Sequence, residues 1–242
     1  MKIQALTLFP EMFAPVLESS IIGLAQKRGL VSFGIINIRD YAYDKHQVCD
    51  DVPYGGGPGM IMKPEPIFRA VRDLRSRGEA PKLILLSPRG TVYNQQLARS
   101  LAAESHLAFL CGHYKDVDER VRTLVDLDIS IGDYILTGGE IAALAVIDSI
   151  VRLLPGAISD PESASLDSFE TGLLDHPHYT RPEDFEEMKV PEVLRSGNHA
   201  LIKAWRRRHA LKLTKQLRPD LYRKATLTPE DLELLDETDD EA

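Results

Sequence analysis

Cysteine is scarce in this sequence: Cys49 and Cys111 are the only two among 242 residues. They form neither a CxxC pair nor a metal-ligand spacing, so we expect buried or idle thiols rather than a disulfide or a zinc site. No apolar run approaches the roughly 20 residues that a membrane span needs, and residues 1–4 lack the pattern of a signal peptide. These absences predict a cytoplasmic protein without membrane contact. Nothing repeats at a fixed period, which argues against a repeat architecture.

The chain has enough apolar residues, 43%, to bury a full core in one large domain or two. Its net charge of −8 argues against a nucleic-acid partner, but the charges are unevenly distributed. Residues 195–224 contain ten lysines and arginines and a single acid, Asp220, whereas every charged residue from Glu230 onward is acidic. Such a basic segment is typical either of a solvated helix face or of an RNA-binding surface, and composition leaves both open.

Strand and helix patterns alternate along most of the chain. The predicted strands are residues 2–8, 31–38, 82–86, 107–110 and 125–131, and the predicted helices are 12–28, 64–78, 94–104, 117–125 and 141–154. Strands that alternate with helices favour a mostly parallel sheet covered on both faces. The expected fold class is therefore α/β.

Three loops follow predicted strands, at residues 86–89, 111–114 and 131–139. Because the carboxyl ends of parallel strands meet at one edge of a sheet, we expect these loops to converge there. Open α/β sheets bind small molecules at this edge, and the glycines in the third loop permit close approach to the backbone. An ordinary tight connection between a strand and a helix is the alternative.

A long segment with little periodicity covers residues 39–62 and contains Tyr54-Gly55-Gly56-Gly57-Pro58-Gly59. It lacks the Gly-Lys-Ser/Thr ending of a phosphate-binding P-loop and does not match the dinucleotide fingerprint. A structureless loop of this length is uncommon in a compact domain unless it is functional. We interpret it as a flexible wall or lid over a ligand.

The composition changes after the apolar helix predicted at 141–154. Residues 157–174 are rich in Ser, Asp, Glu and Gly, which is typical of a linker. The predicted organisation is a domain at 1–158, a flexible linker at 159–174 and a helical domain at 175–242. Asn198 and Thr228 are expected to cap helices in the last part. His176, His178 and His199 do not have zincin spacing, so no metal site is expected.

Arg152 stands near the end of a predicted buried helix, where an arginine needs an anion or carbonyl partner. It could also satisfy the carbonyls at the negative end of the helix dipole. Asp167 lies in the linker and by default reads as a loop or cap residue. Both residues are open to a structural or a catalytic role.

Seven segments together resemble one family: residues 8–13, 51–60, 111–114, 118–121, 130–140, 172–182 and 196–200. Their order and content are similar to those of the bacterial TrmD family, the tRNA (guanine-N1)-methyltransferases of the SPOUT superfamily. The resemblance extends from residue 3 to about residue 235. It implies methyl transfer from S-adenosylmethionine to N1 of the guanosine at position 37, next to the tRNA anticodon. A methyltransferase of the same fold with another RNA target, or a non-catalytic RNA-binding protein, remains the alternative.

The fold implied by the resemblance is a SPOUT-type parallel sheet with a deep trefoil knot and a small C-terminal helical domain. General topology rules make a knot very rare, so only the resemblance supports it. The implied roles of the three parts are cofactor binding at 1–158, flexible connection at 159–174 and tRNA binding at 175–242. The implied partners are the tRNA anticodon stem-loop and a second copy of the chain, in a homodimer with shared active sites.

The resemblance also assigns residues to roles. It implies that Asp167 is the general base and that Arg152 stabilises negative charge on guanine O6. The implied cofactor contacts are Leu86, Ser87, Pro88, Gly112, Ile131, Gly132, Asp133, Tyr134, Ile135, Leu136, Gly138 and Gly139. The implied substrate contacts are Asp50, Tyr54, Gly55, Gly59, His178, Arg181, Asn198 and His199. Lys115-Asp116 stands where many members have Glu-Gly, which leaves a Mg²⁺ requirement open.

Overall fold

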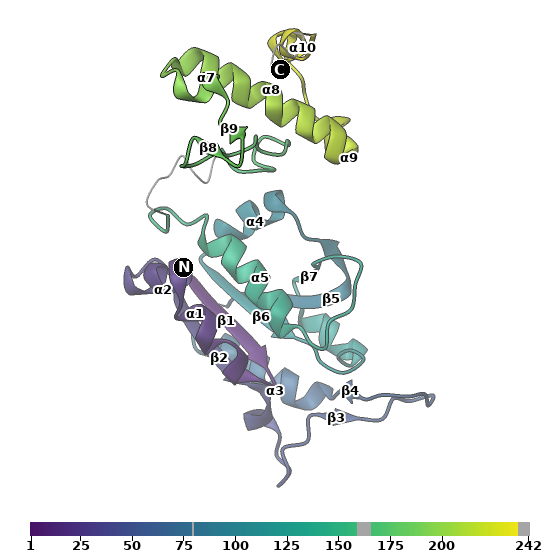
Figure 1. Ribbon diagram of the computed structural model, residues 1–242. Helices are drawn as coiled ribbons and strands as arrows, with labels where there is room; N and C mark the ends of the chain where they lie inside the picture. The colour runs from purple at the N-terminus through teal and green to yellow at the C-terminus, as the bar shows by residue number, and fades with distance from the viewer. Residues whose placement is uncertain (79, 159–165, 237–242) are drawn as a thin grey trace. The chain divides into compact units, whose positions relative to one another are not determined.

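The computed structural model describes residues 1–78, 80–158 and 166–236, and the chain divides into two compact units, Met1–Pro161 and Glu162–Ala242 (Figure 1). The division falls inside the predicted linker, residues 159–174. Part of that linker, residues 159–165, lies outside the described residues. The assignment of cofactor binding to one unit and tRNA binding to the other stays a prediction.

A five-stranded sheet forms the centre of the first unit, in the order β2-β1-β6-β5-β7. Its strands are β1 (Lys2–Thr7), β2 (Ser32–Asn37), β5 (Lys82–Val92), β6 (His106–Cys111) and β7 (Leu127–Ser130). All neighbouring pairs are parallel. The predicted α/β class with a parallel sheet is confirmed.

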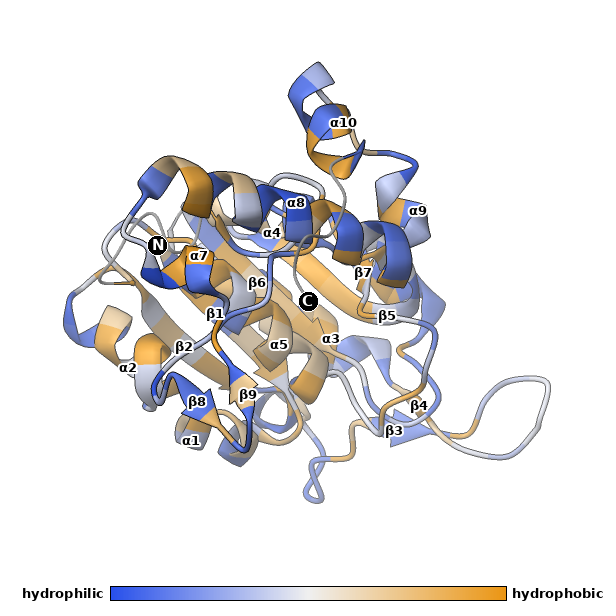
Figure 2. Ribbon diagram, turned by 45° about the horizontal axis from the view of Figure 1, so that its top comes forward, coloured by the Kyte–Doolittle hydropathy of each residue, from blue (hydrophilic) through white to orange (hydrophobic). Residues whose placement is uncertain are grey.

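Apolar side chains fill the space on both faces of this sheet, because successive residues of a strand point to opposite sides. On one face Ile3, Leu107 and Phe109 pack with helix α5 (Glu140–Val151). On the other face Leu6 and Leu110 belong to the cluster that includes helix α3 (Pro64–Ser76). Figure 2 shows the strands as an apolar layer between the helices. The sheet is therefore packed between two separate apolar cores, one on each face.

The other elements of the first unit are short. They are α1 (Ala14–Leu17), α2 (Ser20–Lys27), α4 (Gln95–Ala102), the 3-10 helices η1 (Pro10–Met12), η2 (Ile38–Tyr41) and η3 (Glu119–Leu124), and the two-residue strands β3 (Asp50–Asp51) and β4 (Ile61–Met62). The single helix predicted at 12–28 is wrong, since Ser20 has φ +50 and interrupts it. The helix predicted at 117–125 is a 3-10 helix instead.

Strand β5 is longer than the sequence predicts. Residues 87–90, expected as a loop after the strand, belong to it and bulge out between two points of pairing with β7. Leu86 and Thr91 both pair with Ile129. A Cβ on Gly90 would lie 2.4 Å from the Ile129 nitrogen, so glycine permits this close crossing. The turn-forming residues Ser87-Pro88-Arg89-Gly90 thus mark a bulge, not a strand end.

The second unit is mostly helical. It contains β8 (Asp184–Phe185), β9 (Met188–Lys189), α7 (Glu192–Arg195), α8 (His199–Leu217), α9 (Pro219–Tyr222) and α10 (Pro229–Asp236). Helix α8 is mainly hydrophilic (Figure 2) and buries only Trp205, Leu211 and Thr214. As predicted, Asn198 caps α8, its side-chain oxygen accepting hydrogen bonds from two backbone N–H groups. No helix in the described parts of the chain combines the length and apolar character needed to cross a membrane.

Helix α10 is fixed to α8 by a buried carboxylate. Asp231 is 3% exposed and accepts hydrogen bonds from Arg207 Nε at 2.7 Å and Nη2 at 2.8 Å. It also accepts from the Thr228 backbone, while its own N–H donates to Thr228 Oγ1. These bonds, the Arg207 pair above all, lower the pKa of Asp231 from 3.8 to about 2.

We expect this carboxylate to make the second unit sensitive to acid. A pKa depressed in the folded state gives stability that is full above pH 3.8 and is lost as the pH falls through about 2. Because Arg207 is partly exposed, Asp231→Asn should cost about 1–2 kcal/mol at neutral pH. Thermal melts of both proteins over a pH series should show the Tm difference shrinking below pH 3.8. A difference that stays constant down to pH 2 would contradict the assignment.

Candidate functional site

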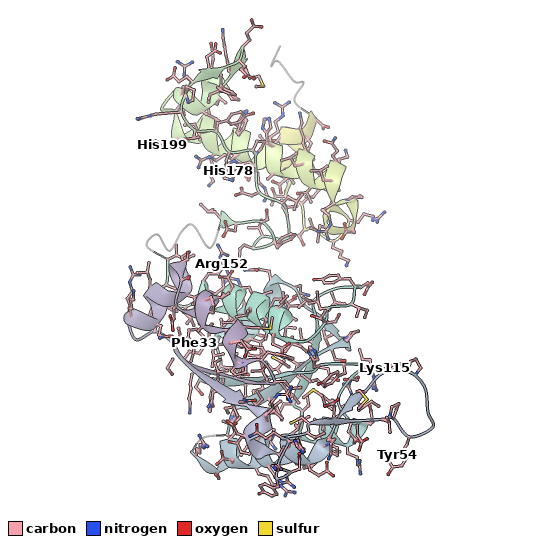
Figure 3. The ribbon with its side chains drawn as sticks, turned by 60° about the horizontal axis from the view of Figure 1, so that its bottom comes forward. Phe33, Tyr54, Lys115, Arg152, His178 and His199 are labelled. Carbon is pink, nitrogen blue, oxygen red and sulfur yellow. The ribbon has the colours of Figure 1, made fainter. Side chains whose placement is uncertain are left out.

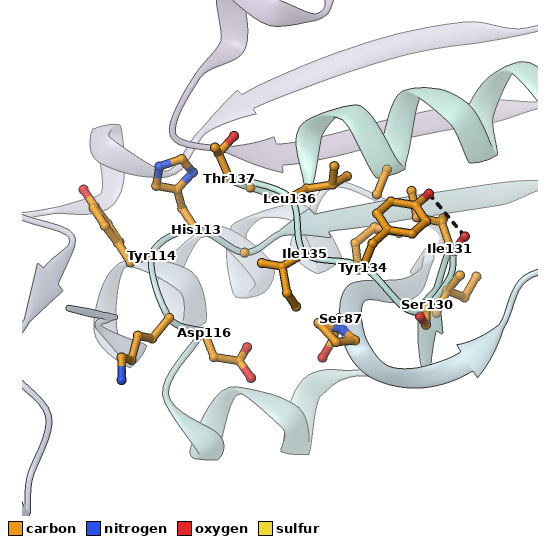
Figure 4. A pocket seen from close by; sticks show the side chains of 18 of the residues that line it. Ser87, His113, Tyr114, Asp116, Ser130, Ile131, Tyr134, Ile135, Leu136 and Thr137 are labelled. Atoms are coloured by element: carbon orange, nitrogen blue, oxygen red, sulfur yellow. Dashed lines mark hydrogen bonds between the residues drawn. The ribbon is translucent and has the colours of Figure 1, made fainter. Parts of the chain in front are cut away.

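A pocket opens at the carboxyl ends of β6 and β7 and beside the bulge in β5, where the three segments predicted as loops meet (Figure 4). We call it the sheet-edge pocket. Its lining residues are Leu86, Ser87, Pro88, Gly112, His113, Tyr114, Lys115, Asp116, Ile129, Ser130, Ile131, Gly132, Tyr134, Ile135, Leu136, Thr137, Gly138, Gly139 and Ala142. The convergence expected from the topology is confirmed.

Every predicted cofactor contact except Asp133 lines the sheet-edge pocket. Eight residues that the resemblance does not assign as cofactor contacts also line the pocket: His113, Tyr114, Lys115, Asp116, Ile129, Ser130, Thr137 and Ala142. Most of these are neighbours of predicted residues in the same two loops. Residues 113–116 could have been predicted from the sequence, because they directly follow Gly112 and a loop at a strand end turns several consecutive residues toward one opening.

The backbone at the base of the pocket is packed too tightly for side chains. Gly139 N–H donates to Gly112 O at 2.8 Å, joining the loop before α5 to the loop after β6. A Cβ on Gly139 would lie 2.8 Å from Cys111 Cα and 3.1 Å from the Gly112 nitrogen. Because these atoms belong to the backbone, they cannot move aside easily. Glycine at 139 thus permits the contact that closes the pocket.

Aromatic and apolar side chains form the outer rim. Tyr134 folds back over Gly132, whose hypothetical Cβ would be 2.7 Å from the tyrosine ring, and its hydroxyl donates to Ile131 O at 3.3 Å (Figure 4). Tyr134 and Ile135 are 55% and 79% exposed. Exposed apolar groups beside backbone polar groups suit a ligand with a flat ring and hydrogen-bonding edges.

One arginine ties the polar side of the pocket together. Arg122 Nη2 donates to Ser87 Oγ at 3.2 Å and to Asp116 Oδ2 at 3.1 Å, and Nη1 donates to Asp128. The Arg122 side chain is 13% exposed. Asp116 is therefore an ion-paired carboxylate at the pocket, held next to the β5 bulge.

Below the pocket lies a buried polar group. Glu140, 2% exposed, accepts a 2.7 Å hydrogen bond from Thr7 Oγ1. Burial raises the pKa of the nearby Cys111 thiol well above its usual value, and the Glu140 charge adds to this. Burial likewise raises the pKa of Cys49. Both thiols are free and buried, as the sequence predicted; a neutral thiol is a poor nucleophile or metal ligand.

The loop between β3 and β4 extends from the body of the unit toward solvent (Figure 3). Asp50 starts it in β3, and Tyr54 near its tip is fully exposed. Gly55 and Gly59 both have positive φ, which glycine adopts without strain. Lys115 N–H donates to Met60 O at 3.1 Å, so the base of this loop is joined to the rim of the sheet-edge pocket. The loop therefore begins beside this pocket, and its role as a wall or lid stays a prediction.

The remaining predicted residues lie outside this pocket. Arg152 lies at the C-terminal end of α5 in the first unit, and its backbone N–H donates a hydrogen bond to the backbone carbonyl oxygen of Asp148. Asp167 is a half-buried residue at the start of the second unit. His178 and Arg181 lie in the segment before β8, and Asn198 and His199 begin α8. The structure describes each unit by itself, so these residues are located but not joined into one site.

Comparison with known proteins gives concordant matches. Residues 1–224 match the family model described as tRNA (Guanine-1)-methyltransferase TrmD. A tRNA (guanine-N(1)-)-methyltransferase of Dictyoglomus turgidum is 53% identical over 98% of this chain and 96% of that protein. Those of Brevibacillus brevis and Anoxybacillus flavithermus are each 55% identical, the first over 100% of this chain and 99% of that protein, the second over 94% of both.

Proposed function

Because this chain belongs to the TrmD family of tRNA (guanine-N1)-methyltransferases, we propose that it transfers a methyl group from S-adenosylmethionine to N1 of guanosine 37 in tRNA. The observation that carries the proposal is the sheet-edge pocket, because two of the segments that line it, 111–114 and 131–139, belong to the segments that resemble the family. The position within tRNA is the finer part of the proposal. A tRNA substrate also implies a cytoplasmic enzyme.

The sheet-edge pocket fits the methyl donor in shape and chemistry. Leu86, Ile131 and Leu136 offer apolar contact to a purine ring, while the backbone at Gly112 and Gly138 offers hydrogen bonds. S-adenosylmethionine, when bound, supplies an electrophilic methyl group on a sulfonium sulfur. The chain positions that group and keeps water away from it. We also propose that the loops around this pocket form the family's trefoil knot.

Two residues are proposed to act on guanine. N1 of guanine carries a proton and is a poor nucleophile until the proton leaves; Asp167 accepts it as general base. Negative charge then develops on O6, and the guanidinium of Arg152 stabilises it. Asp167 and Arg152 belong to different units, so the proposal requires the two units, of one chain or of two, to meet over the substrate.

Recognition of tRNA is assigned to exposed residues of both units. The loop that contains Asp50, Tyr54, Gly55 and Gly59 would contact guanosine 37 and the unpaired bases beside it. The exposed Tyr54 ring would stack on such bases. His178, Arg181, Asn198 and His199 would contact the anticodon stem-loop beside the basic helix α8. Position 37 lies in a single-stranded loop, so its Watson–Crick edge is accessible.

We propose a homodimer with active sites shared between subunits. Helix α5 is largely apolar, and its Ile141 side chain is 51% exposed. This exposed apolar side chain would pack against a second copy of the chain. A Mg²⁺ requirement would rest on Asp116, because position 115 is a lysine. Asp116 is already paired with Arg122, so the ion would compete with that pair. Methyl transfer measured with and without added Mg²⁺ decides this point.

The test is methylation of defined RNA by the full chain. We expect label from methyl-labelled S-adenosylmethionine to enter an unmodified tRNA transcript with guanosine at 37, at N1 of that base. The same transcript with adenosine at 37 should gain none, and neither should ribosomal RNA. Label in ribosomal RNA alone, or equal label in both transcripts, would overturn the proposed target. Cofactor binding without transfer to any RNA would indicate a non-catalytic RNA-binding protein.

A further inference from the structure

Three potential metal ligands meet in the second unit, just before β8. Asp175, His176 and His178 each offer one ligand atom, and these atoms lie within 4.8 Å of one another. His178 Nε2 is 2.9 Å from Asp175 Oδ2, and His176 Nε2 is 3.7 Å from Asp175 Oδ1. The two imidazole rings lie side by side, with centroids 4.4 Å apart. The spacing of these histidines in the sequence did not predict a metal site.

We propose that Asp175, His176 and His178 bind a divalent transition-metal ion. Bonds of about 2.0–2.2 Å place neighbouring ligand atoms about 3.3–3.6 Å apart around a tetrahedral ion. His178 Nε2 lies 2.9 Å from Oδ2 of Asp175 and His176 Nε2 lies 3.7 Å from Oδ1. Rotation of the carboxylate and of the exposed His178 ring would therefore be needed to bring one oxygen and both nitrogens around the ion. Two imidazoles and one carboxylate suit Zn²⁺ or Co²⁺ better than Mg²⁺ or Ca²⁺, which prefer oxygen ligands alone.

The surroundings orient the ligands as a metal site requires. His176 Nδ1 lies 2.9 Å from the carbonyl oxygen of Pro177. Donation of the Nδ1 proton to that carbonyl leaves the lone pair on Nε2, which faces Asp175; metal-ligating histidines are commonly fixed in this way. The Asp175 carboxylate is held in turn, since its Oδ1 accepts from His176 N–H at 2.7 Å. The first two ligands are therefore preorganised.

The segment that carries the ligands is fastened to the rest of the unit. Leu174 N–H donates to Thr214 Oγ1 of α8 at 2.9 Å, and Asp175 N–H donates to Ser168 Oγ at 2.9 Å. The His176 ring contacts the edge of Trp205 on the same helix. His176 and Asp175 are 15% and 22% exposed, whereas His178 is 69% exposed. The ion would thus be bound on the inner side and open to water on the outer side.

This proposal goes beyond methyl transfer and does not depend on it. The metal would link the His178 side chain to the segment packed against α8. The alternative is that the three side chains bind no ion and that the Asp175–His178 hydrogen bond only stabilises this segment.

The test is metal binding by the full-length chain after treatment with a chelator. Calorimetric titration with ZnCl₂ should show one equivalent bound, and CoCl₂ should give the visible absorption of a site with nitrogen and oxygen ligands. His178→Gln, at an exposed position that leaves packing intact, should weaken Zn²⁺ binding at least about tenfold, and Asp175→Asn should do the same. His46→Gln, at an exposed loop position outside the cluster, is the matched control and should bind like the wild type.

Circular dichroism of each variant separates loss of binding from loss of folding. The proposal is overturned if the folded wild-type chain shows no saturable Zn²⁺ binding. It is also overturned if folded His178→Gln binds Zn²⁺ as tightly as the wild type, because the ion would then sit elsewhere. Neither readout uses methyl transfer, so failure of the metal site leaves the proposed function untouched.

Discussion

Asp167→Asn is expected to lower the rate of methyl transfer at saturating substrates by about a hundredfold or more, the usual contribution of a positioned general base. Asparagine keeps the size and polarity of the side chain but cannot accept the N1 proton. Affinity for tRNA and for S-adenosylmethionine should stay near that of the wild type. Single-turnover rates, with binding measured separately, check both statements.

A carboxylate in the same segment provides the control. Glu170→Gln, three residues further on, removes the same charge and should keep wild-type activity. Equal losses in both variants would indicate a general electrostatic effect and contradict the role of Asp167. Mixing Asp167→Asn with Arg152→Ala, each strongly impaired alone, should restore part of the activity if one site draws these residues from two subunits. Absence of any recovery after subunit exchange would count against shared sites.

Gly139→Ala is expected to damage both stability and cofactor binding. Its methyl group would lie 2.8 Å from Cys111 Cα, and the 2.8 Å hydrogen bond to Gly112 O would be forced apart. Overpacking of this kind costs about 1–3 kcal/mol, or about 2–4 °C in Tm for each kcal/mol in a chain of this size. Since the same contact closes the sheet-edge pocket, affinity for S-adenosylmethionine should fall at least about tenfold.

Gly112→Ala is the matched comparison. There the nearest side-chain atom to the new methyl group would be Val117 Cγ1, at an ordinary 3.7 Å. This variant should melt close to the wild type, even if its methyl group narrows the pocket. Thermal melting and calorimetric titration of both variants with S-adenosylmethionine separate the effects. Equal melting temperatures for Gly139→Ala and wild type would show that the backbone relaxes around residue 139.

Much of the first unit followed from local patterns. Apolar runs such as residues 107–110 are buried on both faces, and burial of that kind is visible in a sequence. The convergence of the loops at the sheet edge followed from the parallel direction of the predicted strands. The family assignment, which used the motifs on these loops, is confirmed.

Other features depend on contacts that no local pattern encodes. Ser87-Pro88-Arg89-Gly90 contains turn-forming residues, yet pairing with β7 resumes beyond it and extends β5 to Val92. Ser20 interrupts an otherwise continuous helical pattern through its backbone conformation. The ion pair between Arg122 and Asp116 joins residues whose closeness depends on how η3 folds back against the pocket. The roles of Asp167 and Arg152 came from resemblance alone and remain predictions.

The bulged course of β5 has a consequence for how a ligand is received. Its outward residues 87–90 are fixed at both ends by ladder hydrogen bonds, so this wall loses little conformational entropy when a small molecule arrives. The projecting loop around Tyr54 is paired only at its base, through β3 and β4, so its exposed tip must be ordered at the expense of binding free energy. Residues 87–90 should therefore determine which small ligands bind. The loop around Tyr54 should determine how tightly the larger RNA binds.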